Sequence, residues 1–326
     1  MKFTPTDTET YNTVKEDVLV SVSVEEIEME MVYFKAGTFK MGSPTTETRR
    51  NAALEAQWDV TLSKGFYIGK YEVTQDQYEA VMENNPSKNN EDNLAEGETQ
   101  GRRPVDNVCW FDTLVFCNKL SLLHGLDPAY VIFEQTDPEK WGEVPDSTHD
   151  NFAHWNLVKI VDGSNGYRLP TEAQWEYACR AGTPTPYNTG VSTPDSNIGW
   201  YLSNSGSKTH EVGLKYSNVL GILDLGFGLY DMHGNVSEWC WDWMGVYPTT
   251  AGTDPTGPDA MPTTGDYARS RVLRGGHFMD SPTPGGTNTP INFRSASRSY
   301  ARPDLKEQAV GTPRPGMGFR VVRPEE

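Results

Sequence analysis

Apolar residues at helical spacing predict three helices in this chain. The segment 111–123 should pack one face on a core, since it carries the stripe Leu114, Val115, Cys117, Leu120 and Leu123. A second helix is predicted from the N-cap Thr74 to about Met82. A third is predicted after Pro170 and Thr171, where Glu172 would stabilise the positive end of the helix. Its inward face should carry Trp175, Tyr177 or Ala178, and Cys179.

The remaining pattern favours short strands joined by many turns. Residues 31–42 read as a hairpin about a Gly-centred turn, and 66–73 as a further strand. The polar segment 127–163 reads as a long loop with one short strand pair. Beyond residue 183 short strands alternate with Gly, Pro, Asn and Ser, and 316–322 should form a terminal strand. The elements therefore predict an α+β fold with high loop content.

Composition supports one large folded domain. The chain has 326 residues, and its 9 Trp, 15 Tyr and 12 Phe supply bulky apolar surface for a core. The 30 Gly and 22 Pro follow no period, as expected for many turns. We expect residues 1–30 to be a polar N-terminal segment or tether and 31–326 to form the domain. No apolar run is long enough to span a membrane.

The charge excludes one class of partner. The formal net charge is −17 and the pI about 4.8. Affinity for nucleic acid depends on clustered Lys and Arg that neutralise phosphates. We therefore expect no nucleic-acid partner.

The cysteines fit no metal or redox motif. Cys109, Cys117, Cys179 and Cys240 form no C-x-x-C pair, so neither a zinc ribbon nor a thioredoxin-type motif is present. They could pair as disulfides or remain buried free thiols, which pack as small apolar residues. The His149 and His154 pair has no convincing third ligand, and we interpret it as structural.

Several motifs in a fixed order resemble the formylglycine-generating enzyme (sulfatase-modifying factor) family over residues 31–323. They are GTFKMGS (37–43), KYEVTQDQY (70–78), RPVDNVCWFDTLVFCNKLS (103–121), YRLPTEAQWEYACRAG (167–182), GLYDMHGNVSEWCWDW (228–243), RVLRGG (271–276), RSASR (294–298) and GFRVVR (318–323). The resemblance implies a C-type lectin-like fold with a small antiparallel sheet and two main helices.

The family's catalytic cysteines are missing from this sequence. In the family's enzymes a cysteine pair between the RGG and R-x-A-x-R motifs binds copper and oxidises a substrate cysteine. Here that interval, residues 277–293, contains no Cys, and a thiolate is needed as ligand and redox centre. We expect no oxidase activity, no copper and no required cofactor. The alternative is an enzyme or enzyme accessory that uses His277, Asp280 and Arg298.

The C-terminal part resembles variable proteins whose binding surface is diversified by a retroelement. The resemblance makes 271–326 the candidate variable region and a protein or other macromolecule the expected ligand. Lys306, Glu307 and Met317 are not easily made by mutating adenines in Asn-type codons, so only some positions could vary. The predicted ligand-binding residues are Trp110, Trp200, His277, Phe278, Met279, Asp280, Asn288, Asn292, Ser297, Ser299, Tyr300 and Arg302.

The resemblance also implies a calcium site and an exported protein. Gly234 and Val236 would offer carbonyls and Glu238 a carboxylate, the oxygen ligands that calcium prefers. Alternatively, Glu238 accepts hydrogen bonds within a tight turn. We expect the arginines of the terminal motifs to pair with buried carboxylates or stack on rings; these are Arg294, Arg298 and Arg320. The expected location is the cell surface or periplasm, with a lipid anchor on an N-terminal segment since removed.

Overall fold

The computed structural model describes residues 27–146, 148–194, 196–215, 228–281, 292–306 and 316–325. Asn288, Glu307 and most of the predicted N-terminal tether lie outside these residues. The last residues assigned to that tether contact the folded body, because Lys70 pairs with Glu30 at 2.7 Å and Gln77 donates to the carbonyl of Glu28.

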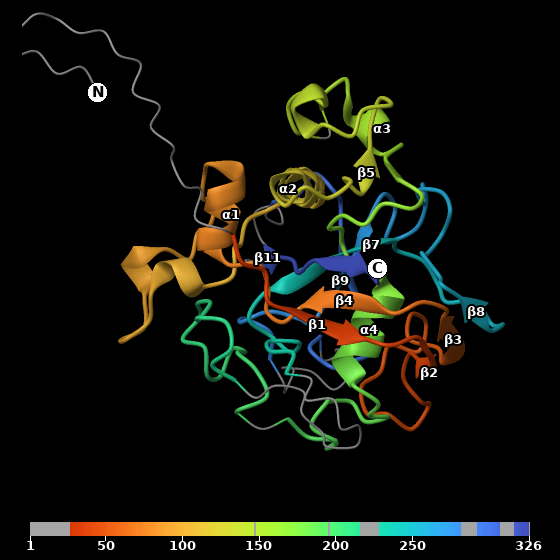
Figure 1. Cartoon of the computed structure of the whole chain (residues 1–326). Coiled ribbons are helices and arrows are strands. Elements are labelled where there is room, and N and C mark those ends of the chain that lie inside the picture. Colours follow the sequence, from red (N-terminus) through yellow and green to blue (C-terminus); the bar gives the residue numbers. More distant parts are fainter. Residues whose placement is uncertain are drawn as a thin grey trace, which may run out of the picture.

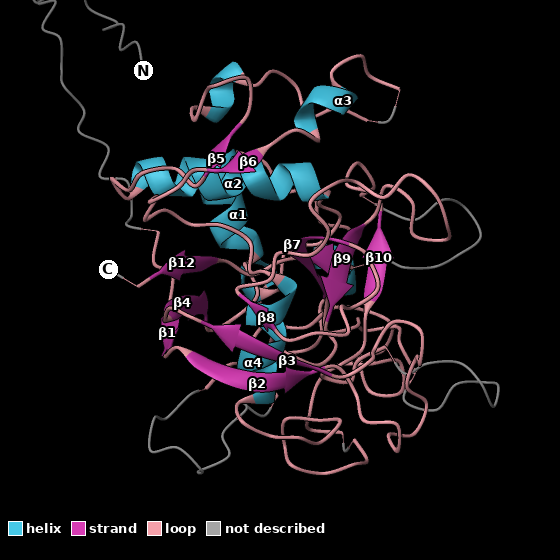
Figure 2. Cartoon of the chain, turned by 90° about the vertical axis from the view of Figure 1, so that its right-hand side faces the viewer, coloured by secondary structure: helices cyan, strands magenta, loops and turns pink. Residues whose placement is uncertain are grey.

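The strands form small, mostly antiparallel sheets (Figures 1 and 2). One sheet has the order β1-β4-β12, with the bounds Met31–Phe34, Phe66–Gly69 and Val322–Pro324. A second has the order β10-β9-β7-β11, with the bounds Ser299–Ala301, Arg271–Arg274, Ser237–Trp243 and Met317–Gly318. A third has the order β2-β3-β8, with the bounds Gly37–Met41, Trp58–Leu62 and Gly252–Thr253. The predicted strand pair of the long loop is confirmed as β5 (Tyr130–Val131) with β6 (Lys159–Ile160).

The hairpin predicted for residues 31–42 is wrong. β1 pairs with β4, and β2 pairs with β3, so this whole segment runs antiparallel to residues 58–69. The register shifts by one residue between the pairs Phe34–Phe66 and Gly37–Leu62. The β1–β4 pair and the β2–β3 pair therefore belong to two different sheets. The predicted terminal strand is also divided: β11 is parallel to β7, whereas β12 is antiparallel to β4.

The predicted helices are confirmed. The α-helices are α1 (Gln75–Met82), α2 (Trp110–Leu123), α3 (Phe152–Trp155) and α4 (Glu172–Arg180). Short 3₁₀ turns are η1 (Glu91–Asn93), η2 (Gln100–Arg102) and η3 (Pro138–Lys140). Thr74 caps α1 and Thr171 caps α4, each in a capping box that satisfies backbone N–H groups of the first turn. No helix in the described part of the chain is long and apolar enough to cross a membrane.

Two large apolar clusters form most of the core of the described residues, and a third, small one consists of Tyr187, Ile198, Tyr201 and Phe293. The first surrounds α2 and the second surrounds α4; Figure 1 shows α2 above strands β4 and β9, with α4 below them. All four cysteines are buried and free, as in the free-thiol alternative. On α4, Trp175, Ala178 and Cys179 are buried, as predicted.

Trp110 corrects the prediction of a ligand-facing residue. Its side chain is 0% exposed, and its Nε1 donates to the carbonyl of Cys240 at 2.9 Å. The guanidinium of Arg271 lies 3.8 Å from the Trp110 ring centre and 3.4 Å from that of Trp243. The bunched tryptophans therefore enclose a buried cation, which a cation–π contact stabilises once water is removed.

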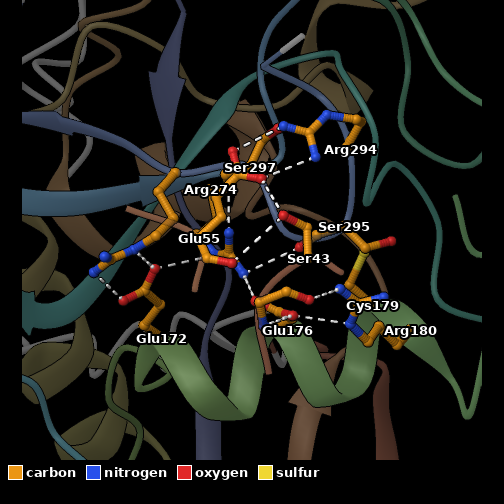
Figure 3. Close-up of polar contacts among 12 residues, drawn as sticks. Ser43, Glu55, Glu172, Glu176, Cys179, Arg180, Arg274, Arg294, Ser295 and Ser297 are labelled. Atoms are coloured by element: carbon orange, nitrogen blue, oxygen red, sulfur yellow. Dashed lines mark hydrogen bonds and ion pairs between the residues drawn. The ribbon is translucent and has the colours of Figure 1, made fainter. Parts of the chain in front are cut away.

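A buried network of arginines and glutamates joins α4 to the C-terminal motifs (Figure 3). Glu172, Glu176 and Arg180 lie on one face of α4, since they are spaced by four residues. Glu176 accepts from Arg180 at 2.8 Å and from Arg274, whereas Glu172 accepts from Arg298 at 2.6 Å. Each of these charges is balanced by a neighbour, which a low-dielectric interior requires.

A second branch of this network reaches the N-terminal loops. Arg294 donates to both carboxylate oxygens of Glu55, at 2.8 and 3.0 Å, and also contacts Glu47. Ser43 donates to Glu55 at 2.8 Å, and the N–H of Gly42 donates to Glu176 at 2.8 Å. Hence the RSASR segment is tied to residues more than two hundred positions earlier in the chain.

We predict that Glu176→Ala lowers the free energy of unfolding by about 3–5 kcal/mol, because it leaves Arg180 and Arg274 buried with their charge uncompensated. Urea denaturation measures this loss. The matched control is Asp59→Ala, which breaks an exposed pair with Lys40 and should cost about 0–1 kcal/mol. Similar small losses for both variants would contradict a structural role for the network.

Candidate functional site

A tight turn follows β9 at the position of the predicted ligand residues. We call residues 277–280 the recognition turn. Gly276 precedes it at φ 73°, and a Cβ there would lie 2.8 Å from Cβ of Phe293, so the approach requires glycine. The N–H of Asp280 donates to the carbonyl of His277 at 2.8 Å, and the N–H of His277 donates to Oδ2 of Asp280 at 2.9 Å. The turn is thus closed by backbone and side-chain bonds.

The recognition turn is anchored to two other segments. The N–H of Phe278 donates to the carbonyl of Asn235 at 2.9 Å, and the Phe278 ring is only 2% exposed. The N–H of Leu202 donates to the carbonyl of Asp280 at 2.9 Å, and Ser205 Oγ donates to that of Phe278 at 2.8 Å. These anchors hold the backbone in place whatever the outward side chains are.

The outward side chains of the turn are polar or flexible. Met279, Asp280 and Asn292 are half-buried, and Asn292 Nδ2 donates to Oδ1 of Asp280 at 3.0 Å. His277 is 5% exposed; its Nε2 lies 3.7 Å from Oδ1 of Asp280, and its Nδ1 accepts from the N–H of Met279 at 3.1 Å. The side chains of His277 and Phe278 are therefore buried beneath the turn and support its backbone.

Asn235 connects the turn to the loop that carries Trp200. Its N–H donates to the carbonyl of Trp200 at 2.9 Å, and its side chain accepts from the N–H of His210 at 3.1 Å. Its Nδ2 donates to Glu72 at 2.8 Å. Asn235 is fully buried with φ 56°, a conformation that Asn tolerates better than most residues. Sequence reasoning missed this position, although the His-Gly-Asn run hinted at a turn.

Trp200 lies beside the recognition turn, but its ring is packed against other side chains of the protein. Its ring stacks on His210, with ring centres 3.7 Å apart, and the Nζ of Lys215 lies 3.7 Å from the Trp200 ring centre. Glu98 in turn contacts Nδ1 of His210 at 2.6 Å. Trp200 is half-buried, and its ring is held in a stack with His210 and Lys215.

The other predicted ligand residues lie elsewhere. β10 runs antiparallel to β9, with Ser299 opposite Leu273 and Ala301 opposite Arg271, so Arg302 lies beyond the far end of β9 from the turn. Ser297 is 2% exposed, and its carbonyl accepts from Arg274. Hence Ser299, Tyr300 and Arg302 are separate from the recognition turn. Tyr300 packs edge-on against Tyr267, and Arg302 pairs with Asp304 at 2.8 Å.

Arg298 does not join the alternative catalytic set. Both oxygens of Glu172 accept from Arg298, at 2.6 and 2.7 Å, and the carbonyl of Gly245 accepts a further hydrogen bond at 2.6 Å. The structure brings His277 and Asp280 together and places Arg298 in the buried network instead. The predicted pairing of Arg294, Arg298 and Arg320 with buried carboxylates is confirmed.

The carboxylate predicted to bind calcium is engaged by protein groups. Arg320 donates to both oxygens of Glu238, at 2.6 and 2.7 Å, and Trp175 Nε1 donates to Oε2 at 2.7 Å. Gly234 and Val236 lie in the adjoining turn, where the N–H of Val236 donates to Glu72 at 3.0 Å. Glu238 thus accepts hydrogen bonds, as in the alternative, but from Arg320 and Trp175.

The thiols of the described residues do not have the environment of a redox centre. Burial raises the pKa of Cys179 to about 12, and its Sγ lies 3.8 Å from Nε2 of His233. That histidine cannot act as an activating cation, because burial lowers its pKa to about 4.

Comparison with known proteins identifies the family. The sequence model described as the sulfatase-modifying factor enzyme 1-like domain matches residues 18–325. The chain belongs to this family. The C-type lectin-like fold of the formylglycine-generating-enzyme type, predicted from the motifs, is thereby confirmed.

Individual relatives of this family differ in their named roles. The chaperone protein LppX of Paenibacillus barcinonensis is 38% identical, over 90% of this chain and 89% of that protein. The formylglycine-generating enzyme of Mus musculus is 29% identical, over 86% of this chain and 73% of that protein. The solved structure of Treponema denticola variable protein 1 has a TM-score of 0.74 and 34% identity, and the match covers 93% of this chain and 98% of that one.

We predict that Asn235→Ala loosens the recognition turn. The substitution leaves the buried N–H of His210 and the Oε2 atom of Glu72 without these partners, which should cost about 2–4 kcal/mol. Urea denaturation gives the loss, and amide hydrogen exchange should show faster exchange at Phe278. The control Asn84→Ala, at an exposed position, should stay within about 0.5 kcal/mol of the parent. Unchanged exchange at Phe278 would show that the turn does not depend on Asn235.

Proposed function

We propose that this protein is a non-catalytic binding protein that recognises a protein or other macromolecule with its recognition turn and Asn292. The observation that carries the proposal is a complete family fold whose interval 277–293 contains no cysteine. The anchors to Asn235, Leu202 and Ser205 support it, since preorganised backbone lowers the entropy cost of binding.

Diversification and export are further parts of this proposal. Similarity to a variable protein supports a surface whose side chains change while the backbone stays fixed. A near-copy of the 3′ end of this gene beside a reverse transcriptase gene, differing mainly at adenines, is the observation that tests it.

We place the protein at the cell surface or in the periplasm, with a lipid anchor on its N-terminal segment, because a displayed surface must reach its ligand.

We predict that a photo-crosslinking amino acid at Met279 captures a partner from the surface fraction of the source cells. Met279 is half-buried at the outer side of the turn, so a bound partner would lie against it. Mass spectrometry should find one discrete adduct, competed by excess unmodified protein. The matched control carries the same amino acid at Leu157, which is 69% exposed and follows α3, and should give no such adduct.

Two results would overturn the proposed function. One is equal capture from both positions, or from neither. The other is turnover of a cysteine-containing peptide to formylglycine by the copper-treated protein, because that would require oxidase chemistry from residues other than the family's cysteine pair.

A chaperone function is the second candidate. It is favoured by the 38% identity to a protein named as a chaperone. A chaperone would bind many unfolded clients, so we predict for this alternative that the intact protein suppresses the light scattering of reduced lysozyme during aggregation. Arg302→Ala serves as the surface control, and Met279→Glu should reduce suppression if the recognition turn holds the client. No suppression at equimolar protein would exclude this alternative.

A further inference from the structure

A pocket of about 180 Å³ lies away from the recognition turn. It forms where β2, β3, the first turn of α4 and the loops after β7 meet. Its walls are mostly apolar or aromatic. The polar residues of the wall are Glu172, Asp242 and Arg298. The apolar residues are Met41, Trp58, Ala173, Val246, Tyr247, Pro248, Pro255 and Pro258. An apolar cavity of roughly 150 Å³ can hold a molecule of the size of benzene. The pocket therefore suits one short side chain or a ligand of similar size.

Two of the polar residues, Glu172 and Arg298, form an ion pair with each other. Arg298 donates four hydrogen bonds, two to Glu172 and one each to the carbonyls of Leu54 and Gly245, which use four of its five N–H groups. Glu172 also accepts from the hydroxyl of Tyr247 at 3.0 Å. The charge of Arg298 is already neutralised by Glu172, which disfavours an anionic ligand.

Two groups of the pocket residues have no full set of partners among the described residues: Nε1 of Trp58, which is buried, and the carboxylate of Asp242. The Asp242 side chain is 3% exposed, and its Oδ2 accepts from the N–H of Glu172 at 2.7 Å. Its Oδ1 accepts no hydrogen bond from the residues that the structure describes. Gly257, also in the pocket wall, lies so close that a Cβ there would be 2.9 Å from Cβ of Asp242. A nearly buried carboxylate oxygen at a pocket is costly unless a ligand or water satisfies it.

The charges around Asp242 oppose one another. Burial and the neighbouring Glu172 raise the pKa of Asp242 to about 7. Arg298 and Arg271 oppose this shift. Arg298 is paired with Glu172, and Arg271 stacks between Trp110 and Trp243 and donates to the carbonyl of Trp241. A ligand that brings a positive charge would stabilise the ionised carboxylate.

We propose that this pocket binds a primary alkylammonium group of about lysine side-chain length. The ammonium donates to Oδ1 of Asp242, and its methylene body packs on Trp58, Tyr247 and Ala173. Trp58 and Tyr247 have ring centres 5.7 Å apart, so they form one aromatic wall. This inference does not rest on the proposed function, because the pocket and the recognition turn share no residue.

The test titrates the intact protein with probes of one length and different charge, followed by the indole N–H signals in NMR. We expect n-butylamine to bind, 1-butanol to bind at least about tenfold more weakly, and butyrate not to bind. Asp242→Asn keeps an acceptor for the N–H of Glu172 but should weaken butylamine binding at least about tenfold, without changing that of butanol. N-acetyl-lysine N-methylamide distinguishes a lysine on a partner from a free amine.

A second variant protects the test against misfolding of Asp242→Asn. Val246 is 63% exposed at the pocket, so Val246→Trp should keep the fold and reduce binding of butylamine by blocking access. Leu214→Trp, at a position 52% exposed outside the pocket, is its control and should change nothing. Equal affinity for butylamine and butanol, preference for butyrate, or no binding of butylamine to the parent protein would overturn the proposal.

Discussion

The structure depends on the pairing of buried arginines with buried glutamates around α4. A lone charge in this interior would be expensive, so Glu176 can be buried only because Arg180 and Arg274 neutralise it. The same requirement fixes Glu172 against Arg298. Since Arg274 ends β9 and Arg298 precedes β10, the charge balance on one helix sets the position of both strands.

This constraint explains how a loop-rich chain can present a rigid surface. The RSASR segment has little regular structure, yet its arginines and the carbonyls of Ser295 and Ser297 are held by the network. The recognition turn follows β9 after Gly275 and Gly276, and it is then fixed by Asn235. Backbone bonds specify its shape, so changes at Met279 or Asn292 need not alter the fold.

Local sequence signals predicted the helices and the short β5–β6 pair, but they failed for the partners of strands that pair over long distances in the sequence. Thr74 and Thr171 are capping residues whose effect lies within one turn, so they could be read directly. Residues 31–42 read as a hairpin because a strand pattern carries no information on its partner, which is residues 58–69. The terminal strand divides around Arg320, which enters the core to reach Glu238. A local pattern cannot reveal a partner so distant in sequence.

The functional site was predicted only in part, because some of its contacts also join residues that are distant in sequence. The RGG motif located the recognition turn, but Trp110 was misplaced because its enclosure of Arg271 is a long-range contact. Ser299, Tyr300 and Arg302 were grouped with His277, although the antiparallel pairing of β9 and β10 separates them. The spacing of Glu172, Glu176 and Arg180 was a signal that could have been used, since a charged stripe among buried residues of a helix requires partners.

The network also separates the two binding regions that we propose. Arg274 lies next to the glycines that lead to the recognition turn, whereas Arg298 and Glu172 form the base of the pocket. Their charges are neutralised within the network, so neither region depends on them for a ligand contact. What remains for ligands is Oδ1 of Asp242 in one region and the outer side chains of the turn in the other. A charge-balanced core can therefore support two surfaces, and substitutions at one need not disturb the other.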